Sequence, residues 1–151
     1  MAQFESKTRV RLSDTDAQGV VYYGRYYDYF DVSRLEMCRR VGVTVSALGK
    51  RGLMFVAAES ACTYEGSAKF DDELTLRVGI SRLGRSSVTY AHSILRGKRI
   101  LARGTVVDVM VDDKGEPSLI PEDVRKKLSR FSTEVTTPRG GSRGLQSRPR
   151  A

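Results

Sequence analysis

The side chains best suited to chemistry in this chain are two carboxylates separated by one residue, Asp14 and Asp16. They lie in a segment rich in Ser, Asp, Thr and Gly, between a stretch with strand periodicity and one with helix periodicity. The first turn of a helix offers unpaired N–H groups and the positive end of the helix dipole. A carboxylate beside such donors can attack a carbonyl carbon, or activate water to do so, while the N–H groups stabilise the oxyanion. Aspartate is also common in turns and helix caps, so these residue types alone leave a structural role open.

A longer pattern around these aspartates resembles the active-site motif of the 4-hydroxybenzoyl-CoA thioesterase-like, YbgC-type hotdog enzymes. The matching residues are Asp14-Thr15-Asp16, Gly19, Val20-Val21, Tyr22 and Tyr26. The resemblance covers roughly residues 4–131. It implies an α+β hotdog fold, in which an antiparallel five-stranded sheet is wrapped around one long central helix. It also implies an acyl-CoA thioesterase, which hydrolyses a thioester to free acid and coenzyme A.

The resemblance assigns roles to individual residues. Asp16 becomes the catalytic nucleophile or general base, and the backbone N–H of Tyr23 polarises the thioester carbonyl. Asp14, Gly19 and Tyr26 become supporting residues. Some YbgC-type relatives have His where this chain has Tyr23, and tyrosine is a neutral donor near pH 7 whereas histidine can shuttle protons. The role of the backbone N–H at position 23 is the same whether the side chain is His or Tyr.

Coenzyme A carries several phosphate charges, and relatives bind them with basic or hydroxyl residues in the loop between the third and fourth strands. Here that loop contains Arg85, Ser86 and Ser87. An arginine can pair with phosphate and the two hydroxyls can donate hydrogen bonds. An ordinary basic hairpin turn is the alternative interpretation. We expect no cofactor other than coenzyme A as part of the substrate.

The hydrophobic pattern predicts the elements that would position these residues. Residues 4–12 alternate as a half-buried strand, with Leu12 on the inward parity. Residues 22–41 have helical period, with an apolar face that includes Tyr23, Tyr26 and Phe30. A short helix over residues 44–50 and a terminal helix over residues 121–131 are also expected, with strands over residues 53–64, 73–83, 86–96 and 99–111. A sheet with one dominant helix leaves an edge and an apolar face exposed, which favours a homodimer or a homotetramer.

The composition is that of a globular domain, with 40% apolar residues and a formal net charge of +8. No apolar run approaches the roughly 18 residues of a membrane helix, and the N-terminus lacks a signal-peptide pattern, so we expect a cytoplasmic protein. Residues 1–131 are predicted to form the hotdog domain, and residues 132–151 a disordered basic tail. Cys38 and Cys62 are expected to be reduced and buried. One histidine and two scattered cysteines do not make a metal site.

Two other functions fit parts of the sequence. Enoyl-thioester hydratases and dehydratases of the hotdog fold pair a histidine with a carboxylate, but the only histidine, His92, has the pattern of a packed strand residue. A non-catalytic acyl-CoA-binding module is the second alternative. A nucleic-acid binder using the basic tail is disfavoured, because no nucleic-acid motif accompanies the charge.

Overall fold

A five-stranded antiparallel sheet forms the centre of the protein. The computed structural model describes residues 3–133. The spatial order of the strands is β1-β3-β4-β5-β2, so β1 and β2 are the two edges. The bounds are close to those predicted: β1 Gln3–Arg9, β2 Met54–Tyr64, β3 Glu73–Leu83, β4 Ser87–Arg96 and β5 Arg99–Val111. The last three strands form the predicted meander of hairpins.

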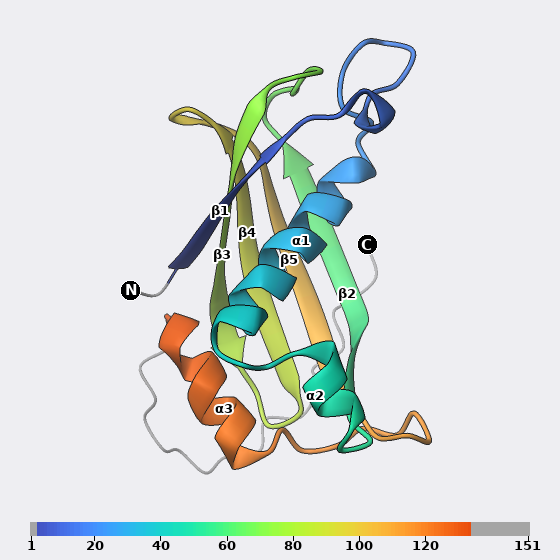
Figure 1. Cartoon of the computed structure of the whole chain (residues 1–151), viewed down its shortest axis with the longest axis vertical. Coiled ribbons are helices and arrows are strands. Elements are labelled where there is room, and N and C mark those ends of the chain that lie inside the picture. The colour runs from blue at the N-terminus through green and yellow to red at the C-terminus, as the bar shows by residue number, and fades with distance from the viewer. Residues whose placement is uncertain (1–2, 134–151) are drawn as a thin grey trace, which may run out of the picture.

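The helices gather on one face of the sheet and at one of its ends (Figure 1). α1, Arg25–Arg40, crosses that face, while α2, Val45–Gly49, and α3, Glu122–Leu128, lie at the end where α1 finishes. Two short 3-10 turns, η1 Leu12–Asp14 and η2 Ser129–Phe131, complete the described elements. None of the helices within residues 3–133 has both the length and the apolar character needed to span a bilayer.

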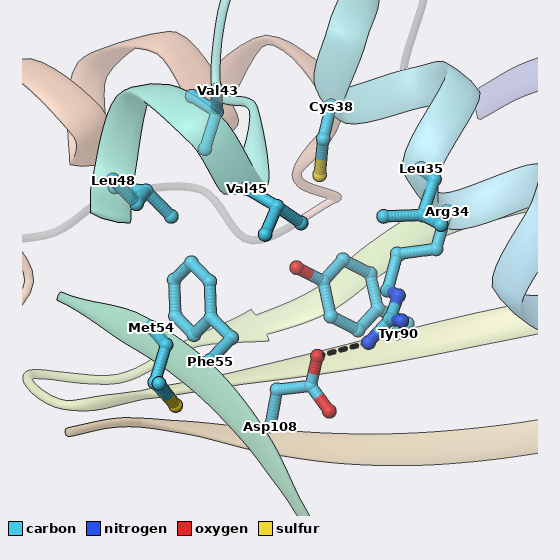
Figure 2. Close-up of a pocket in the computed structure, with 10 residues that line it drawn as sticks. All are labelled: Arg34, Leu35, Cys38, Val43, Val45, Leu48, Met54, Phe55, Tyr90 and Asp108. Atoms are coloured by element: carbon cyan, nitrogen blue, oxygen red, sulfur yellow. Dashed lines mark hydrogen bonds and ion pairs between the residues drawn. The ribbon is translucent and has the colours of Figure 1, made fainter. Parts of the chain in front are cut away.

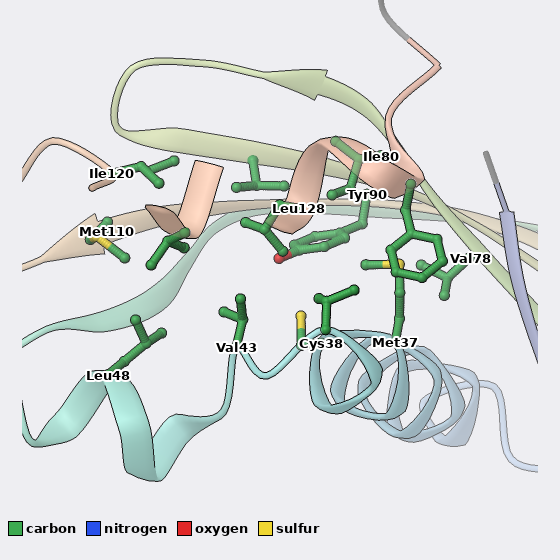
Figure 3. Close-up of a cluster of buried hydrophobic side chains, with 14 residues drawn as sticks. Met37, Cys38, Val43, Leu48, Val78, Ile80, Tyr90, Met110, Ile120 and Leu128 are labelled. Atoms are coloured by element: carbon green, nitrogen blue, oxygen red, sulfur yellow. The ribbon is translucent and has the colours of Figure 1, made fainter. Parts of the chain in front are cut away.

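The core fills the space between α1 and the sheet. Alternate residues of β3 and β4 point toward the helix and are fully buried, as period-two alternation requires. One cluster packs the second half of α1 and α2 against the strands and α3 (Figure 3). A second cluster surrounds Phe30, whose ring lies so close to Gly104 that a Cβ there would be 2.2 Å from it.

Three local predictions were wrong. Leu12 is 71% exposed, because β1 ends at Arg9 and the chain turns into η1 before the inward parity reaches Leu12. Tyr23 is 64% exposed, because α1 begins at Arg25 and Tyr23 precedes the helix. Cys62 is only partly buried, whereas Cys38 is buried as expected, and both are free thiols. The predicted tail lies outside the described residues, apart from Ser132 and Thr133.

The edge strand β2 has an apolar border. Within residues 3–133, β2 pairs only with β5, so its other edge is open. Exposed apolar side chains lie on β2 and on the helices beside it: Val32, Leu35, Val45, Met54, Val56 and Tyr64. Leu35, Val45 and Met54 line one pocket, which places α1, α2 and β2 side by side along this border.

Candidate active site

The loop that carries Asp16 is closed by its own backbone. The Asp16 N–H donates to the Val20 carbonyl at 2.9 Å, and the Gly19 N–H donates to the Asp16 carbonyl at 2.9 Å. Gly19 has φ +79°, a left-handed conformation that glycine adopts without steric cost. Gly19 therefore makes the turn that closes the Asp16 loop.

The Asp16 side chain is partly exposed. Its Oδ1 accepts a hydrogen bond from the Gln18 N–H at 2.8 Å. No residue between 3 and 133 donates a hydrogen bond to its Oδ2, so one carboxylate oxygen is available to a substrate or a water.

Asp14 has opposite surroundings. It is 2% exposed, and its Oδ2 accepts hydrogen bonds from the Arg11 N–H at 2.9 Å and the Tyr29 hydroxyl at 3.0 Å. Burial alone would raise the pKa of Asp14, but these donors and the Arg11 guanidinium outweigh it and hold the pKa below its ordinary value. Asp14 thus anchors the loop to α1 as a buried, charged carboxylate.

The segment leading into α1 provides an unused donor. The Tyr22 N–H donates to the Asp14 carbonyl at 2.9 Å, and the Arg25 N–H donates to the Tyr22 carbonyl at 2.8 Å. Between them, the Tyr23 N–H has no acceptor among residues 3–133. The Tyr23 carbonyl accepts a hydrogen bond from the Tyr64 hydroxyl at 2.9 Å, which ties this segment to the end of β2.

Tyr26 lies beneath this segment in a cluster of tyrosine rings. It is 2% exposed, and its hydroxyl accepts a hydrogen bond from the Ala68 N–H at 3.2 Å. Its ring is nearly perpendicular to those of Tyr29, at 6.1 Å, and Tyr64, at 5.3 Å. Tyr26 therefore packs α1 against the β2–β3 connection and is not an exposed reactive group.

The structure does not bring Arg85, Ser86 and Ser87 to Asp16 within one chain. Glu73, the first residue of β3, pairs with Arg9 at the end of β1 that leads to the Asp16 loop. β3 has 11 residues, and a strand of that length spans about 35 Å. The β3–β4 turn consequently lies at the opposite end of the sheet (Figure 1).

Sequence reasoning missed a buried ion pair. The Arg34 guanidinium donates to Asp108 Oδ2 and, at 3.1 Å, to Asp31 Oδ1. Asp108 is completely buried, and burial raises its pKa in spite of the opposing Arg34 charge. The available signal was a lone carboxylate in the apolar run of residues 106–111.

The packed histidine was predicted correctly. His92 is 3% exposed and stacks on Phe30 with ring centroids 4.6 Å apart. Neither ring nitrogen has a hydrogen-bond partner among the described residues. Burial, reinforced by the nearby Arg34 charge, lowers the pKa of His92 to about 3, so the ring is neutral at physiological pH. A buried, unpaired and neutral ring does not supply the histidine that the hydratase alternative needs.

Comparison with solved structures shows that this chain has the fold of the hotdog thioesterases. A probable thioesterase from Bartonella henselae has a TM-score of 0.76 and 30% identity, over 80% of this chain and 100% of that one. A hypothetical protein from Aquifex aeolicus has a TM-score of 0.80 and 28% identity, over 83% and 98%.

The sequence comparisons give the family. Residues 10–128 match the model of the thioesterase-like superfamily. A protein of Haemophilus influenzae named acyl-CoA thioesterase YbgC is 32% identical over 81% of this chain and 91% of its own length. The chain belongs to the thioesterase-like superfamily.

Proposed function

We propose that this protein hydrolyses acyl-CoA thioesters to free acid and coenzyme A, with Asp16 as nucleophile or general base. The proposal is carried by two groups seven positions apart in the segment that leads into α1: Asp16 Oδ2 receives no donor, and the Tyr23 N–H meets no acceptor, among residues 3–133. Membership of the thioesterase-like superfamily and the acyl-CoA thioesterase name of the Haemophilus relative support the same reaction.

The reaction can follow either of two routes. In the first, Asp16 Oδ2 attacks the thioester carbon, the carbon–sulfur bond breaks, and water hydrolyses the resulting mixed anhydride. In the second, Asp16 accepts a proton from a water that attacks the same carbon. In both, the Tyr23 N–H stabilises the oxyanion, and the departing thiolate takes up a proton. Asp14 holds the loop in place through Arg11 and Tyr29.

The active form in this proposal is a homodimer joined along β2, which can pair further into a tetramer. An open 11-residue edge strand with an apolar border favours pairing with a second copy. Antiparallel pairing about a two-fold axis would set the start of one β2 beside the end of the other. The partner's Arg85, Ser86 and Ser87 would then approach Asp16 and could bind the coenzyme A phosphates, with α1 as the central helix of each wrapped sheet.

A cytoplasmic location is part of the proposal. Cys38 and Cys62 are both free thiols, as is usual in a reducing compartment.

Replacing the catalytic carboxylate tests the proposal. Asp16→Asn keeps the size of the side chain but removes the nucleophile or base, so kcat should fall at least about 100-fold. Turnover is measured by free-thiol release across a panel of acyl-CoAs, and the melting temperature should stay within a few degrees of wild type. Asp28→Asn, on the exposed first turn of α1, is the matched control. Near-normal turnover in Asp16→Asn would rule out the role of Asp16.

A further inference from the structure

Arg125 of α3 holds the turn between β3 and β4 by the carbonyl oxygens of that turn. Its guanidinium donates to the Gly84 carbonyl at 2.7 Å, to the Arg85 carbonyl at 3.2 Å and to the Leu83 carbonyl at 3.5 Å. α3 and the turn lie at the same end of the sheet (Figure 1). One side chain, about 40 positions further along the chain, therefore fixes three successive peptide groups of the turn.

The same contacts decide where the N–H groups of the turn point. In a trans peptide the C=O and the N–H that follows it point in opposite directions. Because the carbonyls of Gly84 and Arg85 face α3, the next two N–H groups, of Arg85 and Ser86, point away from it. Neither N–H has an acceptor among residues 3–133. Successive N–H groups of a turn that face the same way form a nest, which favours an anion.

The positive charges at this turn are not neutralised by carboxylates. An arginine that is partly buried is usually paired with a carboxylate, as Arg34 is with Asp108 (Figure 2). Arg125 is also partly buried, yet it forms no ion pair within residues 3–133. The exposed Arg82 and Arg85 form none within these residues either. The turn therefore combines outward N–H groups with unpaired positive charge, and both attract an anion.

We propose that Arg125 is a positioning residue for the coenzyme. It holds the turn in the shape in which the N–H groups of Arg85 and Ser86, with the Arg85 side chain, bind a phosphate of coenzyme A. The inference rests on the proposed function, which gives the turn its ligand, and adds a residue that does not itself touch that ligand. Donors fixed in advance bind a phosphate without the cost of ordering a loop at that moment.

The experiment separates the phosphate-bearing part of the substrate from its thioester. Butanoyl-CoA and S-butanoyl-pantetheine carry the same thioester, but only butanoyl-CoA has phosphate groups. In Arg125→Met, KM for butanoyl-CoA should rise about tenfold with kcat little changed, and both constants for the pantetheine ester should stay at the wild-type values. Calorimetry with free coenzyme A and free pantetheine measures binding without hydrolysis, and should show the same loss of about tenfold for coenzyme A alone.

A second variant and a control distinguish position from charge. Arg125→Lys keeps the positive charge but lacks the planar fork that reaches three carbonyls, so its affinity for coenzyme A should stay at least about threefold below wild type. Lys126→Met removes one charge from an exposed position of the same helix and should leave both ligands unaffected. Turnover of S-butanoyl-pantetheine in each sample verifies folding and assembly, because that ester has no phosphate for the turn to bind.

The outcomes separate this inference from the proposed function. Unchanged binding of coenzyme A in Arg125→Met, an equal loss for coenzyme A and pantetheine, or full recovery in Arg125→Lys would each overturn the positioning role. Wild type that binds coenzyme A no more tightly than pantetheine would overturn it too, while leaving thioester hydrolysis intact. A loss confined to coenzyme A in a protein that hydrolyses no thioester would support the role of Arg125 and contradict the proposed enzyme activity.

Discussion

Asp14 and Asp16 are two positions apart and have different environments. Asp14 is buried and receives donors from Arg11 and Tyr29, whereas one oxygen of Asp16 receives no donor from residues 3–133. A fully bonded carboxylate is a poor nucleophile and a good anchor, and a partly solvated one can react. The difference in hydrogen bonding therefore separates the structural aspartate from the candidate catalyst.

His92 makes stability depend on pH. Its pKa is about 3 in the folded protein against 6.5 as the ordinary value, because burial disfavours the imidazolium. Above pH 6.5 the ring is neutral in both states. As the pH falls from 6.5 toward 3, the unfolded chain binds a proton that the folded chain does not, and the free energy of unfolding falls by up to about 1.4 kcal/mol per pH unit.

The His92→Phe variant should lose this dependence. Between pH 7.5 and pH 5.0, wild type should lose about 2 kcal/mol more of its free energy of unfolding than the variant. Urea denaturation of both proteins at the two pH values measures this difference, and any change in packing cancels in the comparison. If the free energy of unfolding changed equally with pH in the two proteins, His92 would bind a proton in the folded protein as readily as in the unfolded chain, which contradicts the prediction.

At the scale of elements, the end of β2 positions the start of α1. Tyr64, the last residue of β2, donates its hydroxyl to the Tyr23 carbonyl and packs its ring edge-on against Tyr23 and Tyr26. The N–H proposed to stabilise the oxyanion belongs to the same residue as that carbonyl. Fixing Tyr23 in this way aims a donor before the substrate arrives, which is the condition for stabilising a transition state.

Tyr64→Phe should weaken this positioning without removing the ring contacts. We expect kcat to fall about three- to tenfold with KM little changed, because one hydrogen bond worth about 1 kcal/mol holds the segment. Steady-state kinetics with a single acyl-CoA measures the split between kcat and KM. Tyr27→Phe is the control, since Tyr27 contacts Phe30 and its hydroxyl makes no hydrogen bond within residues 3–133. An unchanged kcat in Tyr64→Phe would show that the Tyr64 hydroxyl does not position Tyr23 and that only the ring contacts matter.

At the scale of the whole molecule, the open edge of β2 sets the expected assembly. One chain separates Asp16 from Arg85, Ser86 and Ser87 by the length of the sheet. Pairing of two copies along β2 would bring both groups together. Assembly and activity are therefore expected to be lost together.

A charge on the β2 edge should separate the copies. Wild type is expected to have at least twice the 16.8 kDa mass of one chain, and Val56→Lys should shift it toward a single chain and lower activity in proportion. Light scattering coupled to size-exclusion chromatography measures the mass. Leu119→Lys places the same charge on an exposed apolar position outside β2, in the segment between β5 and α3, and should stay assembled. A fully active wild-type monomer would contradict the composite site.

Local patterns in the sequence were enough to predict the elements. The strand and helix bounds match within a few residues, because periodicity and turn residues act over a few positions. The motif around Asp16 indicated the family that the comparisons then gave. The burial of His92 also followed from the alternation of its strand.

Tertiary structure decided which distant residues meet. Arg34 and Asp108 are 74 positions apart, and no local pattern could pair them or leave Oδ1 without a donor. The exposure of Tyr23 depended on the residue at which α1 begins, and the distance from Asp16 to Arg85 depended on the order of the strands. Periodicity assigns a residue to a face of its own element, whereas burial, charge pairing and pocket shape arise only when separate elements pack together.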